Sequence, residues 1–201
     1  RYAQVMDAYL SGLEQRLAIG LPIGSIASVA SFFVSRVDTH VDARLLKLIE
    51  VHSPLSEMAA SLPGKAAIAN ARLAYQDFKT VFSSPRFQML KAHGAQLQRP
   101  LWASTSTKNP KYRDVLYVEE LIGPNTVNTI PPQTLSAFLD HGKVRSSIEE
   151  GLVQASQAIK DLAELGIEMT QVTQQLEDEG VKAFSDAFDT LLAAIRSLIA
   201  N

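Results

Sequence analysis

Three short apolar segments, separated by stretches of helical periodicity, constrain the fold of this chain more than any other feature. The first runs from Ile26 to Val34, the second from Pro100 to Ser104 and the third from Thr126 to Ile130. None of them is followed by the tight turn that joins a strand to an antiparallel neighbour. Strands separated by helices pair in parallel through helical crossovers. The sequence therefore predicts an α/β fold with a parallel sheet.

Three parallel strands are too few for a stable open sheet, because both outer edges would stay unpaired. A complete (β/α)₈ TIM barrel takes about 250 residues, and the three units here fit its last three. Further helices are expected from Ser146 to Leu165, from Thr170 to Asp178, and from there to about residue 200. We therefore expect residues 1–201 to form one partial domain, although the pattern also fits a doubly wound sheet without its first half.

The first residues favour a chain that begins inside a larger fold. Apolar residues recur at three- and four-residue spacing from Tyr2 to Leu13, which is one face of an amphipathic helix. No Ser, Thr, Asp or Asn precedes this helix as an N-cap. We interpret the missing N-cap as a sign that the N-terminal part of the barrel is absent from the sequence.

The composition excludes several classes of function. With 46% hydrophobic residues, 20% charged residues and a formal net charge of -2, the chain has no basic surface for nucleic acid. Its longest apolar run is much shorter than a membrane span. Without cysteine, the chain can form neither disulfides nor thiolate metal sites. These properties fit a reducing compartment, so we expect a cytoplasmic protein without a membrane partner.

Polar side chains follow the expected strands, where the reactive groups of parallel α/β folds lie. They are Ser31, Ser35 and Arg36 for the first strand, Ser104 to Lys108 for the second, and Asn128 and Thr129 for the third. Arg36 and Lys108 could together clamp a phosphate, since arginine binds it as a planar fork and lysine as a point charge. Two alternatives remain open. Arg36 could pair with Asp38 or Asp42, and Lys108 could be a solvated loop charge.

The search for a catalytic nucleophile in this chain is negative. A Schiff-base lysine would have to lie on a strand with its pKa lowered by burial, and none of the three segments contains a lysine. The four histidines fall in helices or connecting loops, away from the serines. No cluster of His, Asp and Glu has metal-ligand spacing. We therefore assign no catalytic residue and no metal site.

Segments spread over nearly the whole chain resemble, in order, the motifs of transaldolases, most closely the longer bacterial form. They are Ser25–Asp38, which resembles the sixth-strand motif, then Gly64–Tyr75, Arg99–Thr105, Leu116–Pro131 and Leu176–Phe184. The resemblance implies a (β/α)₈ barrel that transfers a dihydroxyacetone unit from a ketose phosphate to an aldose phosphate. It also implies a lysine imine as the electron sink, so that neither a metal nor an organic cofactor is needed.

The resemblance assigns this chain only part of the site. In the family, the imine lysine lies on the fourth strand and acidic partners lie on the first and third, which would precede Arg1. Ser31 and Arg36 match the family's serine and arginine around the sixth strand, and Ser104 matches the seventh-strand serine. Lys108 stands for the second phosphate-binding cation, although it follows Ser104 at an unusual spacing.

The resemblance implies that the chain is the sugar-phosphate-binding part of a transaldolase, inactive without the missing N-terminal half. Two alternatives are a non-catalytic module that binds sugar phosphates or a protein, and one half of a split aldolase. Simple aldol cleavage, rather than transfer, is a further alternative that these residues leave open.

Overall fold

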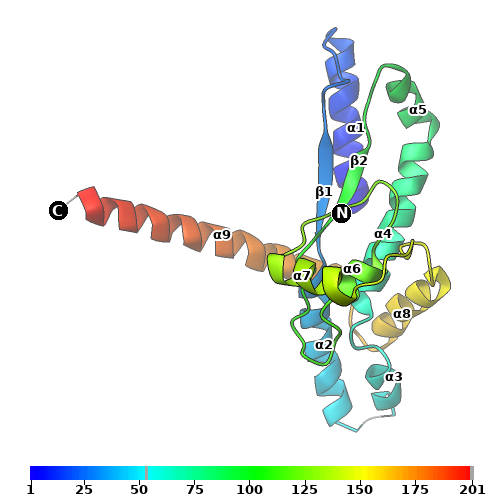
Figure 1. Ribbon diagram of the computed structural model, residues 1–201, viewed down its shortest axis with the longest axis vertical. Coiled ribbons are helices and arrows are strands. Elements are labelled where there is room, and N and C mark those ends of the chain that lie inside the picture. Colours follow the sequence, from blue (N-terminus) through cyan, green and yellow to red (C-terminus); the bar gives the residue numbers. More distant parts are fainter. Residues whose placement is uncertain (53, 200–201) are drawn as a thin grey trace.

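The structure is a computed structural model that describes residues 1–52 and 54–199. Its centre is a sheet of three parallel strands in the order β1-β2-β3 (Figure 1). They are β1 (Ser28–Phe33), β2 (Gln98–Ala103) and β3 (Val127–Asn128). Ser31 lies opposite Leu101 in β2, and Leu101 lies opposite Val127 in β3. The predicted parallel α/β arrangement is confirmed, with strands that begin or end one or two residues from their expected bounds.

The rest of the described chain is mostly helical (Figure 1). The helices are α1 (Tyr2–Ala18), α2 (Val34–Glu50), α3 (Ser56–Ala60), α4 (Ala66–Ser83), α5 (Pro85–Ala92), α6 (Leu116–Glu120), α7 (Pro132–His141), α8 (Leu152–Glu164) and α9 (Met169–Ile199). None of the helices in residues 1–52 and 54–199 is long and apolar enough to cross a membrane.

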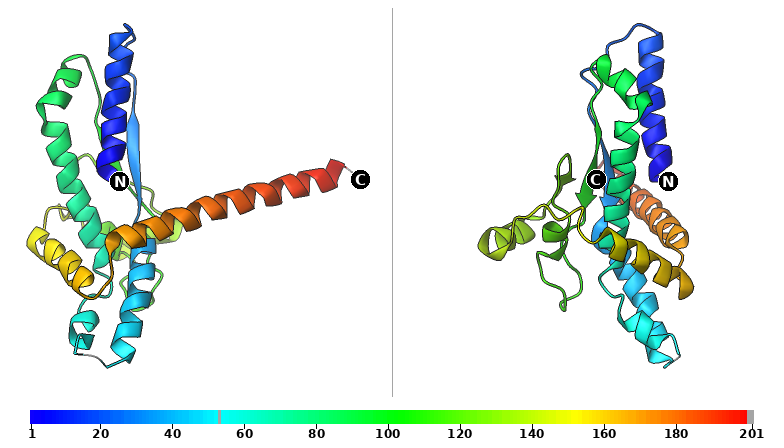
Figure 2. Two further views of the ribbon diagram at one scale, coloured as in Figure 1. Left: turned by 180° about the vertical axis from the view of Figure 1, so that it is seen from behind. Right: turned by 90° about the vertical axis from the view of Figure 1, so that its right-hand side faces the viewer.

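One face of the sheet is covered by helices, and the core lies there. The right-hand view of Figure 2 shows α1 and α4 side by side on this face. Trp102 of β2 is completely buried beneath them, and its indole N–H donates to the carbonyl oxygen of Leu121 at 3.1 Å. Ala30 of β1 is buried on the same face. Burial of a side chain as large as Trp102 contributes about 3–5 kcal/mol, judged by the usual cost of truncating it.

The other face of the sheet is open. Val29 and Phe33 of β1 are 42% and 44% exposed, and Ser31 between them is exposed as well. No strand pairs with the outer edge of β1 within the described residues. Exposed apolar residues beside an unpaired strand edge are features that folded proteins normally cover. The sheet therefore has the properties expected of part of a larger one.

The three helices predicted after residue 145 differ from the structure in two respects. The segments expected to break near Asp178 form one helix, α9, which continues through Gly180. A glycine inside a helix costs about 1 kcal/mol, and side-chain pairs at i and i+4 offset part of that cost on either side, such as Gln175 with Glu179 and Lys182 with Asp186. The predicted end near residue 200 lies outside the described residues.

The helix expected from Ser146 begins only at Leu152. Gly151 has a φ of 61°, a left-handed conformation that separates the helix from the residues before it. The Ser147 hydroxyl donates to the carbonyl oxygen of Glu119 at 2.5 Å and accepts the N–H of Ile122 at 3.1 Å. These tertiary hydrogen bonds hold the segment in an irregular conformation that helical periodicity does not reveal.

Candidate functional site

The candidate site begins where β1 joins α2. β1 ends at Phe33 and α2 begins at Val34, so Ser35 and Arg36 lie in the first helical turn. In the sequence, helical periodicity is evident only from Asp38, one turn after the helix begins. The reason is that no side chain caps α2; instead, the N–H of Ser35 donates to the carbonyl oxygen of Ser104 at 3.0 Å.

Ser104, at the carboxyl end of β2, is the centre of this contact. Its hydroxyl oxygen lies 2.8 Å from that of Ser35, within hydrogen-bonding distance. Ser104 also has a φ of 57°, a left-handed conformation that costs a non-glycine residue about 1–2 kcal/mol. Strained backbone that is retained in a folded protein is concentrated at functional sites. This pair of bonds joins the ends of β1 and β2 and makes Ser104 a candidate site residue.

Arg36 projects from the first turn of α2 and is exposed. Its guanidinium carbon lies 4.2 Å from the centre of the Phe33 ring, a cation–π contact that orients the side chain. The alternative that Arg36 pairs with Asp38 or Asp42 is wrong. In residues 1–52 and 54–199, no carboxylate forms an ion pair with Arg36, so its guanidinium can bind an anion.

Asp38 and Asp42 instead hold α2 against the start of α4. Asp38 accepts the N–H of Ala67 at 2.8 Å, and Asp42 accepts the N–H of Gly64 at 3.0 Å. The first N–H groups of a helix lack partners within it, and an acceptor from a neighbouring element satisfies them. Because the two aspartates follow Arg36 on the same helix, these bonds also fix the position of Arg36.

The same two carboxylates bind the segment that follows Ser104. The Tyr112 hydroxyl donates to Asp42 at 2.6 Å, and the Tyr117 hydroxyl donates to Asp38 at 2.7 Å. Burial raises the pKa of Asp38 to about 6, although the bonds from Ala67 and Tyr117 act against this. Burial also raises the pKa of Asp42, of Tyr112 and of Tyr117. The helix that carries Arg36 and the segment that carries Lys108 are thus joined by one buried and one partly buried hydrogen bond.

Lys108 lies in the middle of that segment and is exposed. Its amino group donates to the Ser106 hydroxyl at 2.9 Å, and no carboxylate pairs with it in the part of the chain that the structure describes. Nearer β2, the buried Thr105 donates its hydroxyl hydrogen to the side-chain oxygen of Asn128 at 2.9 Å. The segment is therefore anchored on both sides of Lys108, by Thr105 before it and by Tyr112 after it.

The structure connects some of the predicted site residues and separates others. Ser104 and Arg36 are joined through Ser35, a strand-end residue that sequence reasoning left out of the assigned site. Ser31 lies within β1 on the open face, and its hydroxyl makes no hydrogen bond to the described residues. Neither Ser31 nor Lys108 is bonded to Ser104 or Arg36 in residues 1–52 and 54–199.

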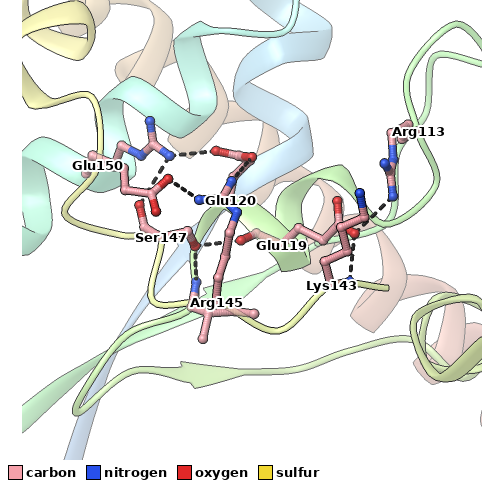
Figure 3. Close-up of polar contacts among 9 residues, drawn as sticks. Arg113, Glu119, Glu120, Lys143, Arg145, Ser147 and Glu150 are labelled. Carbon is pink, nitrogen blue, oxygen red and sulfur yellow. Dashed lines mark hydrogen bonds and ion pairs between the residues drawn. The ribbon is translucent and has the colours of Figure 1, made fainter. Parts of the chain in front are cut away.

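A second polar network holds the far end of the Lys108 segment (Figure 3). Glu119 accepts a hydrogen bond from Arg113 at 2.9 Å and another from the backbone N–H of Lys143 at 2.9 Å. Its neighbour Glu120 pairs with Arg145 at 2.5 Å and with Arg72 of α4 at 2.6 Å. The pair with Arg72 joins α6 to α4. The segment between β2 and α6 is therefore held in place at its far end.

Gly64 offers a test of the contact between Asp42 and Tyr112. It has a φ of 74°, and a Cβ added there would lie 2.9 Å from the Tyr112 ring. Gly64→Ala should lower the free energy of unfolding by about 2–3 kcal/mol, through left-handed strain and displacement of Tyr112 from Asp42. Gly166 has nearly the same φ and open space around it, so Gly166→Ala should cost only about 1 kcal/mol. Equal losses in urea unfolding would contradict a close contact at Tyr112.

No group of three or more His, Cys, Asp or Glu residues is arranged to hold a metal ion among residues 1–52 and 54–199. The strand sequences Ser28–Phe33, Gln98–Ala103 and Val127–Asn128 contain no lysine. The site described above therefore consists of hydroxyls and unpaired cations. Such an arrangement can bind and orient an anion but contains no strand lysine to form an imine.

Comparison with known proteins identifies the class of protein to which this parallel α/β fold belongs. The model of the transaldolase/fructose-6-phosphate aldolase family matches residues 1–195. A transaldolase from Parafrankia sp. is 52% identical over 202 residues, which cover 100% of this chain and 53% of the relative. Transaldolases from Mycolicibacterium smegmatis and Mycobacterium tuberculosis are 52% and 47% identical, with 51% and 52% of their length covered.

The chain belongs to the transaldolase/fructose-6-phosphate aldolase family. This confirms the resemblance to transaldolases that the motifs indicate. The chain spans about half the length of the curated relatives it matches. The mostly helical α/β fold with three parallel strands is consistent with part of a TIM barrel.

Proposed function

We propose that this chain supplies the phosphate-binding side of a transaldolase, which transfers a dihydroxyacetone unit between sugar phosphates. The observation that carries this proposal is the guanidinium of Arg36, which lies over the Phe33 ring without a carboxylate partner among the described residues and follows Ser35, whose hydroxyl is bonded to that of Ser104. These groups lie at the carboxyl ends of neighbouring parallel strands, where α/β barrels bind their substrates. The family membership of the chain supports sugar phosphates as the ligand.

Each residue has a distinct role in this proposal. Arg36 binds two phosphate oxygens as a planar fork, while Lys108 adds a second positive charge from the segment after β2. The N-terminal turn of α2, in which Arg36 lies, favours negative charge because the helix dipole is positive there. Ser31, which is exposed on the open face of β1, binds the sugar part of the substrate in this proposal. Ser104 fixes the position of the α2 turn through Ser35.

The imine-forming step belongs to a different part of the barrel. We propose that the missing N-terminal half contributes the Schiff-base lysine and its acidic partners, so that residues 1–201 alone are inactive. The protonated imine accepts the electron pair released by cleavage of the carbon–carbon bond. The reaction then needs neither a metal nor an organic cofactor. On this proposal the protein works in the cytoplasm, where sugar phosphates are metabolised.

A trapping experiment tests the location of the lysine. Borohydride added to the 201-residue chain with fructose 6-phosphate should leave no covalent adduct, measured by intact-protein mass spectrometry. The same treatment after co-expression with the unmatched half of the Mycolicibacterium smegmatis relative should label that half and restore transfer activity. An adduct on Lys108 would show that this chain forms the imine itself. Such an adduct should then be lost in Lys108→Ala but retained in the matched control Lys47→Ala, on the exposed side of α2.

A further inference from the structure

The last helix of the chain has a long apolar face without a partner. In Figures 1 and 2, α9 leaves the rest of the molecule and projects well beyond it. Its first turns are held to the body, with Val172 fully buried and with Glu179 bound to His40 at 3.1 Å. In Figure 1 and in the left view of Figure 2, the far end of α9 stands away from the other elements. Contacts within the helix support its outer half, such as Lys182 with Asp186 and the Thr190 hydroxyl with the carbonyl oxygen of Asp186.

This outer half carries apolar side chains at regular spacing. We use the name α9 stripe for Val181, Phe184, Phe188, Leu191, Ile195 and Leu198. Their positions alternate by three and four residues, which places them on one face of the helix. Their exposed fractions range from 42% for Ile195 to 77% for Leu198. A continuous exposed apolar stripe of this length marks a surface that another element covers.

The place of α9 beside the sheet points to what covers the stripe. In Figure 1 and in the left view of Figure 2, α9 extends past β1 and away from β2. The right view of Figure 2 places it on the same side of the sheet as α1 and α4. The outer edge of β1 has no strand partner in the described residues. A further strand on that edge, with its crossover helix on the helical side, would place this helix next to α9.

The relatives contain enough chain to supply such a unit. This chain aligns over its whole length with the Parafrankia relative but covers only 53% of it. The family model extends to residue 195, so it includes most of the α9 stripe. We infer that the α9 stripe is a docking surface for the remaining βα units of the barrel, and that it contacts the outer helix beside β1. This inference rests on the proposed function, which requires the same missing half.

Pairing of α9 with a second copy of the chain is less consistent with the side chains. The spacing matches a heptad repeat, but the stripe spans only residues 181–198, less than three full heptads. Phenylalanine occupies two adjacent core positions, Phe184 and Phe188, whereas two-stranded coiled coils favour branched aliphatic residues there. A surface for several helices of a larger domain accommodates such bulky rings more readily than a two-helix seam.

Co-expression of the full 201-residue chain with the unmatched half of the Mycolicibacterium smegmatis relative tests the inference. The two should copurify one to one. Leu191→Asp and Phe188→Asp should each weaken the complex at least about tenfold, because docking would bury a carboxylate. Ala193→Asp places the same charge two residues from Leu191 on the opposite, exposed side of the helix, and should change the affinity less than about twofold. Circular dichroism at 222 nm checks that all variants keep α9 helical.

Three results would overturn the inference. They are the absence of any complex, equal weakening by Leu191→Asp and Ala193→Asp, and a wild-type homodimer that Leu191→Asp dissociates without affecting the complex. Light scattering of the chain alone measures the homodimer. Complex formation is measured without substrate, so a failure of sugar-phosphate binding leaves this result interpretable. Loss of the complex and loss of phosphate binding are thus separate outcomes.

Discussion

Replacement of Arg36 by alanine is expected to weaken the binding of fructose 6-phosphate to this chain about a hundredfold. The change removes a planar, charged donor that has no carboxylate partner among the described residues and is therefore available to the phosphate. Nothing else in the α2 turn can replace its two parallel N–H donors. Ser35 is already bonded to Ser104. Isothermal titration calorimetry with fructose 6-phosphate measures the loss.

Two matched variants separate the contribution of geometry from that of net charge. Lys47→Ala removes one positive charge from an exposed position near the end of α2, and should alter the affinity less than about twofold, because exposed charges are screened over a Debye length. Arg36→Lys keeps the charge but loses the fork, and should bind with intermediate affinity. If Arg36→Ala and Lys47→Ala weaken binding equally, the effect is one of overall charge and the proposed clamp is wrong.

Replacement of Asp38 by alanine should have the largest effect on stability. We expect a loss of about 3–5 kcal/mol in the free energy of unfolding, because two buried donors lose their acceptor. They are the N–H of Ala67 and the hydroxyl of Tyr117. Asp38→Asn keeps an oxygen that accepts the N–H of Ala67 and gains an amide N–H that can donate to the Tyr117 hydroxyl oxygen, so it should cost much less. Urea unfolding at pH 7 measures both variants, and equal costs would contradict this account.

The stabilities of the wild type and of Asp38→Asn should also depend differently on pH. Burial raises the pKa of Asp38 from 3.8 to about 6 in the folded chain. The folded state then holds the proton more tightly than the unfolded state. The stability gained from this carboxyl is fully present below pH 3.8 and is lost as the pH rises through 6. Asp42 has its pKa raised as well and remains in both proteins.

Asp38→Asn should therefore reduce the fall in stability between pH 4 and 6 relative to wild type. Carboxyls with lowered pKa, such as Glu14 and Glu149, act in the opposite direction. They are the same in both proteins, so the difference between the two stability curves isolates Asp38. Urea midpoints measured at half-unit pH steps provide the comparison. Parallel curves would show that Asp38 titrates as an exposed aspartate does.

The sequence predicts the arrangement of the fold better than the boundaries of its elements. Period and composition identify the three parallel strands, because a strand buried beside helices reads as a short apolar run. They miss the early start of α2, since the N–H of Ser35 in its first turn is satisfied by Ser104 and not by a local cap. They also miss the continuity of α9 through Gly180, which local propensity disfavours. A tertiary hydrogen bond determines where α2 begins, and side-chain pairs at i and i+4 support α9 on either side of Gly180.

In the candidate site, too, residues selected by their position in the sequence were predictable, whereas contacts between distant residues were not. Their position after predicted strands is enough to identify Arg36 and Ser104 as candidate site residues. The choice between a free Arg36 and one paired with Asp38 depends on Tyr117, which is 79 residues from Asp38 in sequence. No local pattern contains that information. The spacing of Asp38 and Asp42, one turn apart on α2, was the available sign that both face one neighbouring element.

At position 104, the left-handed backbone favours glycine, whereas the hydrogen bond to Ser35 requires a hydroxyl. Glycine would adopt its φ of 57° without strain, but it would lose the hydroxyl that lies 2.8 Å from Ser35. If the proposed phosphate site is correct, selection for thermal tolerance and selection for ligand binding therefore act on this position in different directions. In a laboratory search for heat-resistant variants, glycine at this position would score as an improvement while it loosened the turn that carries Arg36. A screen that measures stability alone would thus select a better-folded product while it weakens the proposed phosphate site.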